Sequence, residues 1–185
     1  MVLNLEIFGL GKKKEDPRIR GVYDLCVAHA RTPTFYLDYK VPDTMSGRFD
    51  LIVLHTFLFF HRIKAEDDAM KDFGQKVFDT FVEDMDYSLR ELGVGYQKVP
   101  KRMKQMGEAF YGRVDVYDKA LENQDRQAMR QALGNNVYAE FDDVPDVAER
   151  LVEYIFESSD RLTQIPRAAL IEAEFQFPDP ADFLK

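Results

Sequence analysis

Three carboxylates and an arginine recur at helical spacing in the middle of the sequence: Asp79, Glu83, Asp86 and Arg90. At about 100° per residue they lie on one side of a helix, nearly opposite its apolar positions. Grouped carboxylates are candidate ligands for a divalent cation, which would suit a small metal-dependent hydrolase, but one straight row leaves most coordination positions empty. The alternatives are a solvated face with an Asp86–Arg90 pair and a ridge that binds a partner.

The sign of the charge reverses directly after this segment. Residues 98–113 carry a net charge of +4 in a chain whose net charge is -8, because five basic residues stand against Glu108. The basic residues are Lys98, Lys101, Arg102, Lys104 and Arg113. Such a patch is a candidate docking site, and it would also suit a factor associated with the ribosome or RNA. Pairing with the acidic segment 140–160 is the alternative. The overall negative charge disfavours general nucleic-acid binding, and no specific DNA binding is expected.

The remaining candidates for chemistry are three histidines and one cysteine, Cys26. His55 and His61 are six positions apart, so they cannot share a metal ion from one face of a helix. The sequence contains no Walker loop, no GxSxG elbow, no HExxH and no Glu-x-x-His pair. We therefore expect a hydrogen-bonded core histidine at His55, a buried thiol at Cys26 and a protein that is not an enzyme. No catalytic residue, metal ion or cofactor is predicted.

The elements that carry these residues are predicted to be helices throughout. Apolar residues at helical spacing predict helices at 16–30, from 44, at 66–92, from 100, at 125–138 and after 145. The segment 32–43 contains two prolines and is predicted to be an extended loop. The sequence thus indicates one all-α domain, a bundle of about six helices over 16–165. A flexible segment, 1–15, precedes it, and a tail, 166–185, with a short helix and a mobile end follows it.

Two glycines, Gly107 and Gly112, fall inside the predicted helix that begins at Pro100. Each costs about 1 kcal/mol relative to alanine in a helix interior. This cost predicts that another backbone or a ligand approaches the helix closely at these positions.

The composition and the first residues bear on location. A single cysteine is typical of a reducing compartment, and no apolar run reaches the length of a membrane span. The sequence begins without the pattern of a secretory signal, so we expect a cytoplasmic protein. Apolar residues between Val2 and Leu10, followed by Lys12, Lys13 and Lys14, also allow peripheral contact with a membrane.

Four segments resemble the ubiquinol–cytochrome c chaperone family. They are ARTPTFYLDYKVPDTMSGRFDLIVLH at 30–55, FVEDMDYSLRELGVG at 81–95, VPKRMKQMGEAFYGRVDVYDKAL at 99–121 and LGNNVY at 133–138. Together the resemblance covers about residues 16–165 and points to a bacterial form, since the long amino-terminal extension of mitochondrial members is not seen. One departure is Tyr96, which follows the GVG turn where family members often have Asp.

The resemblance implies an all-helical assembly factor for the cytochrome bc1 complex. It implies action on newly made cytochrome b or another bc1 subunit, together with a small partner protein and the ribosome, at the inner membrane. The residues that match the two charged motifs, with the adjacent Lys104, are candidate partner-binding residues: Asp84, Asp86, Arg90, Glu91, Lys101, Arg102, Lys104, Phe110, Tyr111 and Arg113. The function expected from this resemblance is that of a non-enzymatic chaperone.

Overall fold

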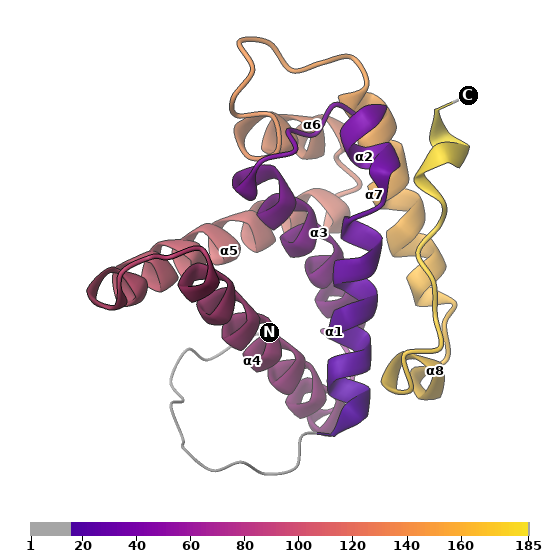
Figure 1. The fold of residues 1–185 in the computed structure, drawn as a ribbon. Coiled ribbons are helices and arrows are strands. Elements are labelled where there is room, and N and C mark those ends of the chain that lie inside the picture. Colours follow the sequence, from indigo (N-terminus) through magenta and orange to yellow (C-terminus); the bar gives the residue numbers. More distant parts are fainter. Residues whose placement is uncertain (1–15, 185) are drawn as a thin grey trace.

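The structure, a computed structural model, describes residues 16–184, and all regular secondary structure in these residues is helical (Figure 1). The longer helices are α1 (Pro17–Ala30), α3 (Met45–Ile63), α4 (Asp68–Glu91), α5 (Val99–Glu122), α6 (Arg126–Asn135) and α7 (Ala148–Thr163). Shorter elements are α2 (Pro33–Leu37), α8 (Arg167–Ile171) and the 3-10 turns η1 (Tyr96–Lys98) and η2 (Pro180–Phe183). The predicted all-α bundle of about six helices is confirmed.

Local chemistry fixes where most of the long helices begin. The side chains of Asp16, Thr44, Asp67 and Asp125 each accept a hydrogen bond from a backbone N–H in the first turn of α1, α3, α4 and α6. This capping satisfies donors that have no partner within the helix. Pro17 adds a preset backbone angle at the first position of α1. The caps explain why the predicted helix starts at Asp16 and near Thr44 agree with the structure.

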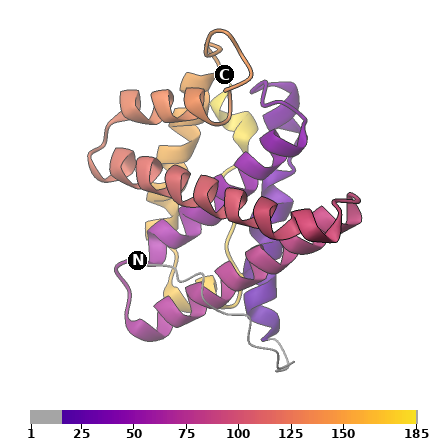
Figure 2. The same ribbon diagram turned by 90° about the vertical axis from the view of Figure 1, so that its left-hand side faces the viewer.

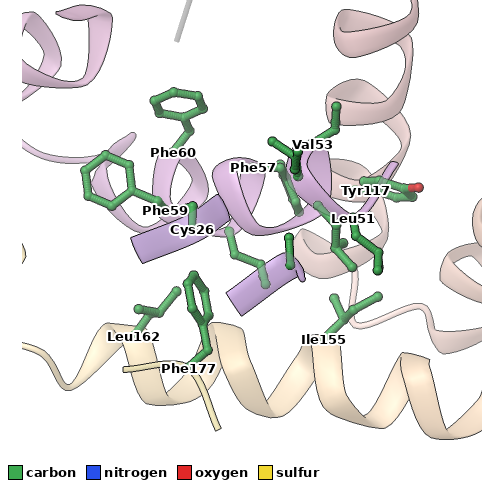
Figure 3. Close-up of a cluster of buried hydrophobic side chains, with 14 of the residues drawn as sticks. Cys26, Leu51, Val53, Phe57, Phe59, Phe60, Tyr117, Ile155, Leu162 and Phe177 are labelled. Atoms are coloured by element: carbon green, nitrogen blue, oxygen red, sulfur yellow. The ribbon is translucent and has the colours of Figure 1, made fainter. Parts of the chain in front are cut away.

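Helix α3 forms the centre of the core and is buried on nearly all sides. It packs against α1, α4, α5 and α7, so its apolar residues face neighbours in every direction. Figure 3 shows Phe57, Phe59 and Phe60 of α3 in one cluster with Cys26 of α1 and Leu162 of α7. The thiol of Cys26 is buried, as predicted, and burial raises its pKa to about 12. Within residues 16–184 no helix combines the length and the apolarity needed to cross a bilayer.

The structure corrects the prediction of an extended loop at 32–43. Residues Pro33–Leu37 form the short helix α2, which begins with Pro33 at its first position and buries Phe35 completely. Two prolines in the segment predicted an extended path, but a proline in the first turn of a helix loses no intrahelical hydrogen bond. The ring of Phe35 then packs against His55 and Tyr154.

The segment after Pro166 is packed against the bundle. Phe175 and Phe177 are buried in the core between α1, α3 and α7. The hydroxyl of Tyr39 donates a hydrogen bond of 2.7 Å to the carbonyl oxygen of Pro180. Figure 1 shows this segment, in yellow, running alongside α7. We call the segment after α8 the strap. It buries single aromatic residues rather than one face of a helix, which explains the weak periodicity in this part of the sequence.

Two glycines have opposite surroundings. A β-carbon at Gly47, in the first turn of α3, would lie 2.0 Å from the carbonyl oxygen of Pro42, so only glycine fits there. At Gly112 nothing lies within 4 Å of an added β-carbon, and the residue is exposed. Within residues 16–184 no other backbone therefore approaches Gly112 closely, and the approach of a ligand stays a prediction. Gly107 is half-buried on the same helix.

Candidate partner-binding surface

Helices α4 and α5 form a hairpin whose tip projects from the rest of the bundle (Figures 1 and 2). Gly93 ends α4 with a left-handed backbone angle (φ 76°), and its N–H donates to the carbonyl oxygen of Arg90 at 2.9 Å. The N–H of Val94 reaches back to the carbonyl oxygen of Leu89 at 3.1 Å, which completes the helix stop. The turn η1 follows and leads directly into α5. The end of the helix predicted at 66–92 agrees with the end of α4 at Glu91.

Four of the acidic residues of α4, which we call the acidic arm (Asp79, Glu83, Asp86 and Glu91), do not converge. Asp79 accepts a hydrogen bond from Gln75 at 2.9 Å, and Asp86 accepts two from Arg90 at 2.5 and 3.0 Å. Glu83 is exposed. Among residues 16–184 no group of three or more His, Cys, Asp or Glu side chains is arranged to hold a metal ion. The geometry of this row therefore gives no support to a metal-dependent hydrolase.

Asp84 points the other way, toward the bundle. Its carboxylate accepts a hydrogen bond of 2.8 Å from the hydroxyl of Tyr23 on α1. Burial, followed by this hydrogen bond to Asp84, raises the pKa of Tyr23 far above its ordinary value. The structure thus uses Asp84 to hold α4 against α1, and it places this candidate away from the exposed face of the hairpin.

The basic arm consists of Lys98, Lys101, Arg102 and Lys104, all exposed at the start of α5. Lys104 lies 3.8 Å from Glu108, whereas the other three form no ion pair with any carboxylate of residues 16–184. Pairing with the acidic segment 140–160, the alternative considered above, is therefore not found in the described chain. These cations are available to an anionic partner.

Arg113 is separate from the basic arm, and its side chain points into the bundle. Its guanidinium contacts the buried carboxylate of Asp50 on α3, with nitrogen–oxygen distances of 2.6 and 2.7 Å, and lies over the ring of Phe49. Asp50 is 1% exposed. Burial raises the pKa of Asp50 to about 6, and the positive charge of Arg113 opposes that rise. This pair ties α5 to α3 and leaves Arg113 little freedom to bind a partner.

The two aromatic candidates also differ. Phe110 is fully buried among Phe60, Phe78 and Phe81, so it anchors α5 in the core and is not part of the exposed surface. Tyr111 is half-buried, with its ring against Phe78 and Phe110. Of these two residues, only Tyr111 reaches the surface of the hairpin.

Three exposed apolar residues near the tip were missed by the sequence analysis: Tyr87, Leu92 and Tyr96. They are 62%, 56% and 80% exposed. The guanidinium of Arg90 lies over the ring of Tyr96, 5.3 Å from its centre, and so joins the end of α4 to η1. A signal was present, because Tyr87 falls on the polar face of α4 and Tyr96 follows a two-glycine turn.

His55 lies in the core, next to the half-buried ring of His29. His55 donates from Nδ1 to the carbonyl oxygen of Leu51 at 2.7 Å, and its Nε2 accepts from the hydroxyl of Tyr154 at 2.8 Å. Burial lowers the pKa of His55 to about 3, with a further contribution from His29, whose ring centre is 5.1 Å away. The prediction of a hydrogen-bonded core histidine at His55 is confirmed.

Comparison with known proteins adds an independent observation. The sequence model of the family described as Ubiquinol-cytochrome C chaperone matches residues 37–177. The crystal structure of the Cbp3 homolog from Brucella abortus is similar, with a TM-score of 0.81 and 40% identity over 89% of this chain and 91% of that chain.

Two curated relatives are longer than this chain. Ubiquinol-cytochrome-c reductase complex assembly factor 1 from Xenopus laevis is 28% identical over 134 residues, which cover 72% of this chain and 66% of that protein. The mitochondrial protein CBP3 from Saccharomyces cerevisiae is 25% identical over 150 residues, which cover 79% of this chain and 44% of that protein. With the family match spanning most of the helical domain, this chain belongs to the ubiquinol–cytochrome c chaperone family.

Proposed function

We propose that this protein is a non-enzymatic assembly chaperone for the cytochrome bc1 complex. Its client in this proposal is newly made cytochrome b or a related membrane subunit of the respiratory chain. The observation that carries the proposal is the family match over residues 37–177, since relatives bear the name of assembly factors for this complex. The relatives are longer than this chain, so the activity is transferred as a proposal.

The α4–α5 hairpin supplies the surface for this role. Its surface carries both signs of charge, with the half-buried Asp86 and the exposed Arg90 and Glu91 on α4. The exposed Lys101, Arg102 and Lys104 lie on α5, beside the half-buried Tyr111. Charges of opposite sign at a rim set the orientation and the rate of binding more than the final affinity. Asp84, Phe110 and Arg113 point toward the bundle and act indirectly, because they fix the position of both helices.

Deletion of the gene tests the proposal. We expect loss of spectroscopically detectable cytochrome b and of ubiquinol:cytochrome c oxidoreductase activity, with restoration by the wild-type gene. The variant Lys101→Glu/Arg102→Glu is expected to restore much less. A matched control, Lys119→Glu/Arg161→Glu, makes the same change of charge at two exposed residues outside the hairpin tip and is expected to restore fully. Normal bc1 levels in the deletion strain would overturn the proposal.

The basic arm favours one additional candidate, association with the ribosome, which is compatible with chaperone action on a nascent client. The observation is that Lys98, Lys101 and Arg102 lack ion pairs within the described chain. Binding to RNA phosphates through such residues weakens steeply with salt. Co-sedimentation with ribosomes is therefore expected to decrease as salt rises and on Lys101→Glu/Arg102→Glu. Sedimentation that is unchanged by both would exclude this candidate.

A further inference from the structure

The tip of the hairpin, residues 90–104, combines exposed apolar side chains with a local positive charge. Leu92 and Tyr96 stand at the apex and are more than half exposed, and the basic arm follows within one to two helical turns. The segment holds five basic residues against Glu91, for a net charge of +4, on a chain whose net charge is -8. The basic residues are Arg90, Lys98, Lys101, Arg102 and Lys104. Both features are concentrated at the tip of the hairpin, which projects from the bundle at the left of Figure 1.

We propose that this tip docks on the surface of an anionic lipid bilayer, with Leu92 and Tyr96 entering the headgroup region and the basic arm contacting lipid phosphates. Tyrosine favours the membrane–water interface because its ring is apolar and its hydroxyl remains hydrated. Lysine and arginine near an anionic leaflet are attracted to its negative surface potential. The tip offers both groups side by side.

The shape of the tip favours a bilayer over a folded protein as its binding partner. A stable protein–protein interface buries about 800 Å² on each partner. Two apolar side chains on a convex turn fall short of that, and Leu89 and Val99, the buried apolar residues beside the turn, are already packed inside the hairpin. A flat bilayer needs no concave surface and is contacted by a projecting tip. The positive charge of the tip favours an anionic bilayer. Such a bilayer repels the rest of the chain, whose net charge is negative, so the tip is the part that makes contact.

The turn is built to hold these residues outward. Gly93 and Gly95 have no atom within 4 Å of an added β-carbon, so the turn is open on the side that faces away from the bundle. Arg90 both pairs with Asp86 and lies over Tyr96, which fixes the ring relative to α4. At the apex, the ring of Tyr96 therefore has a set position relative to α4.

This inference does not require the chaperone function. It concerns a lipid surface and the apex residues, whereas the client is a polypeptide. A purified protein that fails to bind vesicles would remove the inference and leave the chaperone proposal standing. A deletion strain without a bc1 defect would remove the chaperone proposal and leave the inference about the lipid surface standing.

The chain has no tryptophan, which provides a direct test. In Tyr96→Trp the full chain carries a single indole at the apex. We expect its emission to shift to shorter wavelength on adding vesicles of phosphatidylcholine with phosphatidylglycerol, and not with phosphatidylcholine alone. The control Leu37→Trp places the indole at a comparably exposed site outside the tip and is expected to show no shift. No shift in Tyr96→Trp, or equal shifts in both variants, would overturn the proposal.

Flotation with the same vesicles tests the cations. The variant Lys101→Gln/Arg102→Gln is expected to bind on the order of 10- to 30-fold more weakly, since each cation near the surface contributes about 1 kcal/mol. Lys119→Gln/Arg161→Gln is the matched control and is expected to bind like wild type. Binding should also decrease as salt rises. The proposal would be contradicted if wild type and Lys101→Gln/Arg102→Gln bound equally well, or if the protein bound neutral and anionic vesicles equally well. Binding to RNA without binding to vesicles would also contradict it.

Discussion

Arg113 on α5 places its guanidinium 2.6 Å from the buried carboxylate of Asp50 on α3, and this pair joins two helices that are 63 residues apart at the contact. Removing one member of a buried ion pair leaves an uncompensated charge, which costs about 3–5 kcal/mol. We expect Arg113→Gln to lower the free energy of unfolding by that amount in urea denaturation at neutral pH. Asp50→Asn/Arg113→Gln, which removes both charges, should lose less than Arg113→Gln alone. A loss below about 1 kcal/mol for Arg113→Gln would contradict the structural role.

The two contrasting glycines give a matched pair of variants. Gly47→Ala forces a β-carbon against the Pro42 carbonyl and is expected to cost on the order of 1–3 kcal/mol or more. Gly112→Ala adds a methyl group in open space within a helix and should stabilise the protein by about 0.4–1 kcal/mol. Thermal or urea denaturation of both variants measures the difference. Equal effects of the two substitutions would be inconsistent with the packing around Gly47.

His55 should give a distinct pH dependence. Its folded-state pKa, about 3, lies below the ordinary value of 6.5, so the unfolded chain binds the proton first as pH falls. The contribution of His55 to stability is fully present above pH 6.5 and is lost progressively as pH falls toward 3. Between pH 6.5 and 5 this loss is about 2 kcal/mol.

The measurement for His55 must be specific to its ring. Asp50 has a raised pKa, so its contribution has the opposite sign: it falls as pH rises from 3.8 to about 6. Denaturation of the whole chain would therefore mix the two effects. Ring signals of His55 in NMR spectra are expected to stay unchanged between pH 7 and 5. A midpoint near 6.5 would show that the ring is accessible to protons.

The strap after α8 is expected to be essential for stability. Phe177 contacts both His29 and His55, with ring centres 5.1 and 5.0 Å apart, and it is 5% exposed. Phe177→Ala should lower the free energy of unfolding by about 3–5 kcal/mol. Phe141→Ala removes an equally large but exposed ring and should cost much less. If the two variants were equally stable, the strap would not be part of the core.

Helix positions could be predicted from the sequence because they depend on nearby residues. The spacing of Ile19, Val22 and Cys26 marks one face of α1. The capping residue Asp16 accepts a hydrogen bond from a backbone N–H only two positions farther along the chain. The strap could not be predicted in this way. The aromatic rings of Phe175 and Phe177 enter the core singly, and their neighbours His29 and Phe59 are more than a hundred residues away.

The candidate surface was predicted in part for a related reason. Helical periodicity gives the direction of each side chain but not what it meets. Lys101 and Arg102, which belong to the predicted basic patch, are exposed in the structure. The same reasoning gave no means to assign Arg113 to Asp50 or Asp84 to Tyr23, because both pairs depend on how separate helices pack. Tyr96 was missed because an aromatic residue is expected inside unless a projecting turn carries it outward.

The strap also constrains the order of events during synthesis. Translation makes α1, α3 and α7 before residues 175–183, so the pocket around Phe35, His55 and Tyr154 stays open to water until that segment leaves the ribosome. The packing of α1, α3 and α7 around these side chains is consequently completed only after residues 175–183 have been translated.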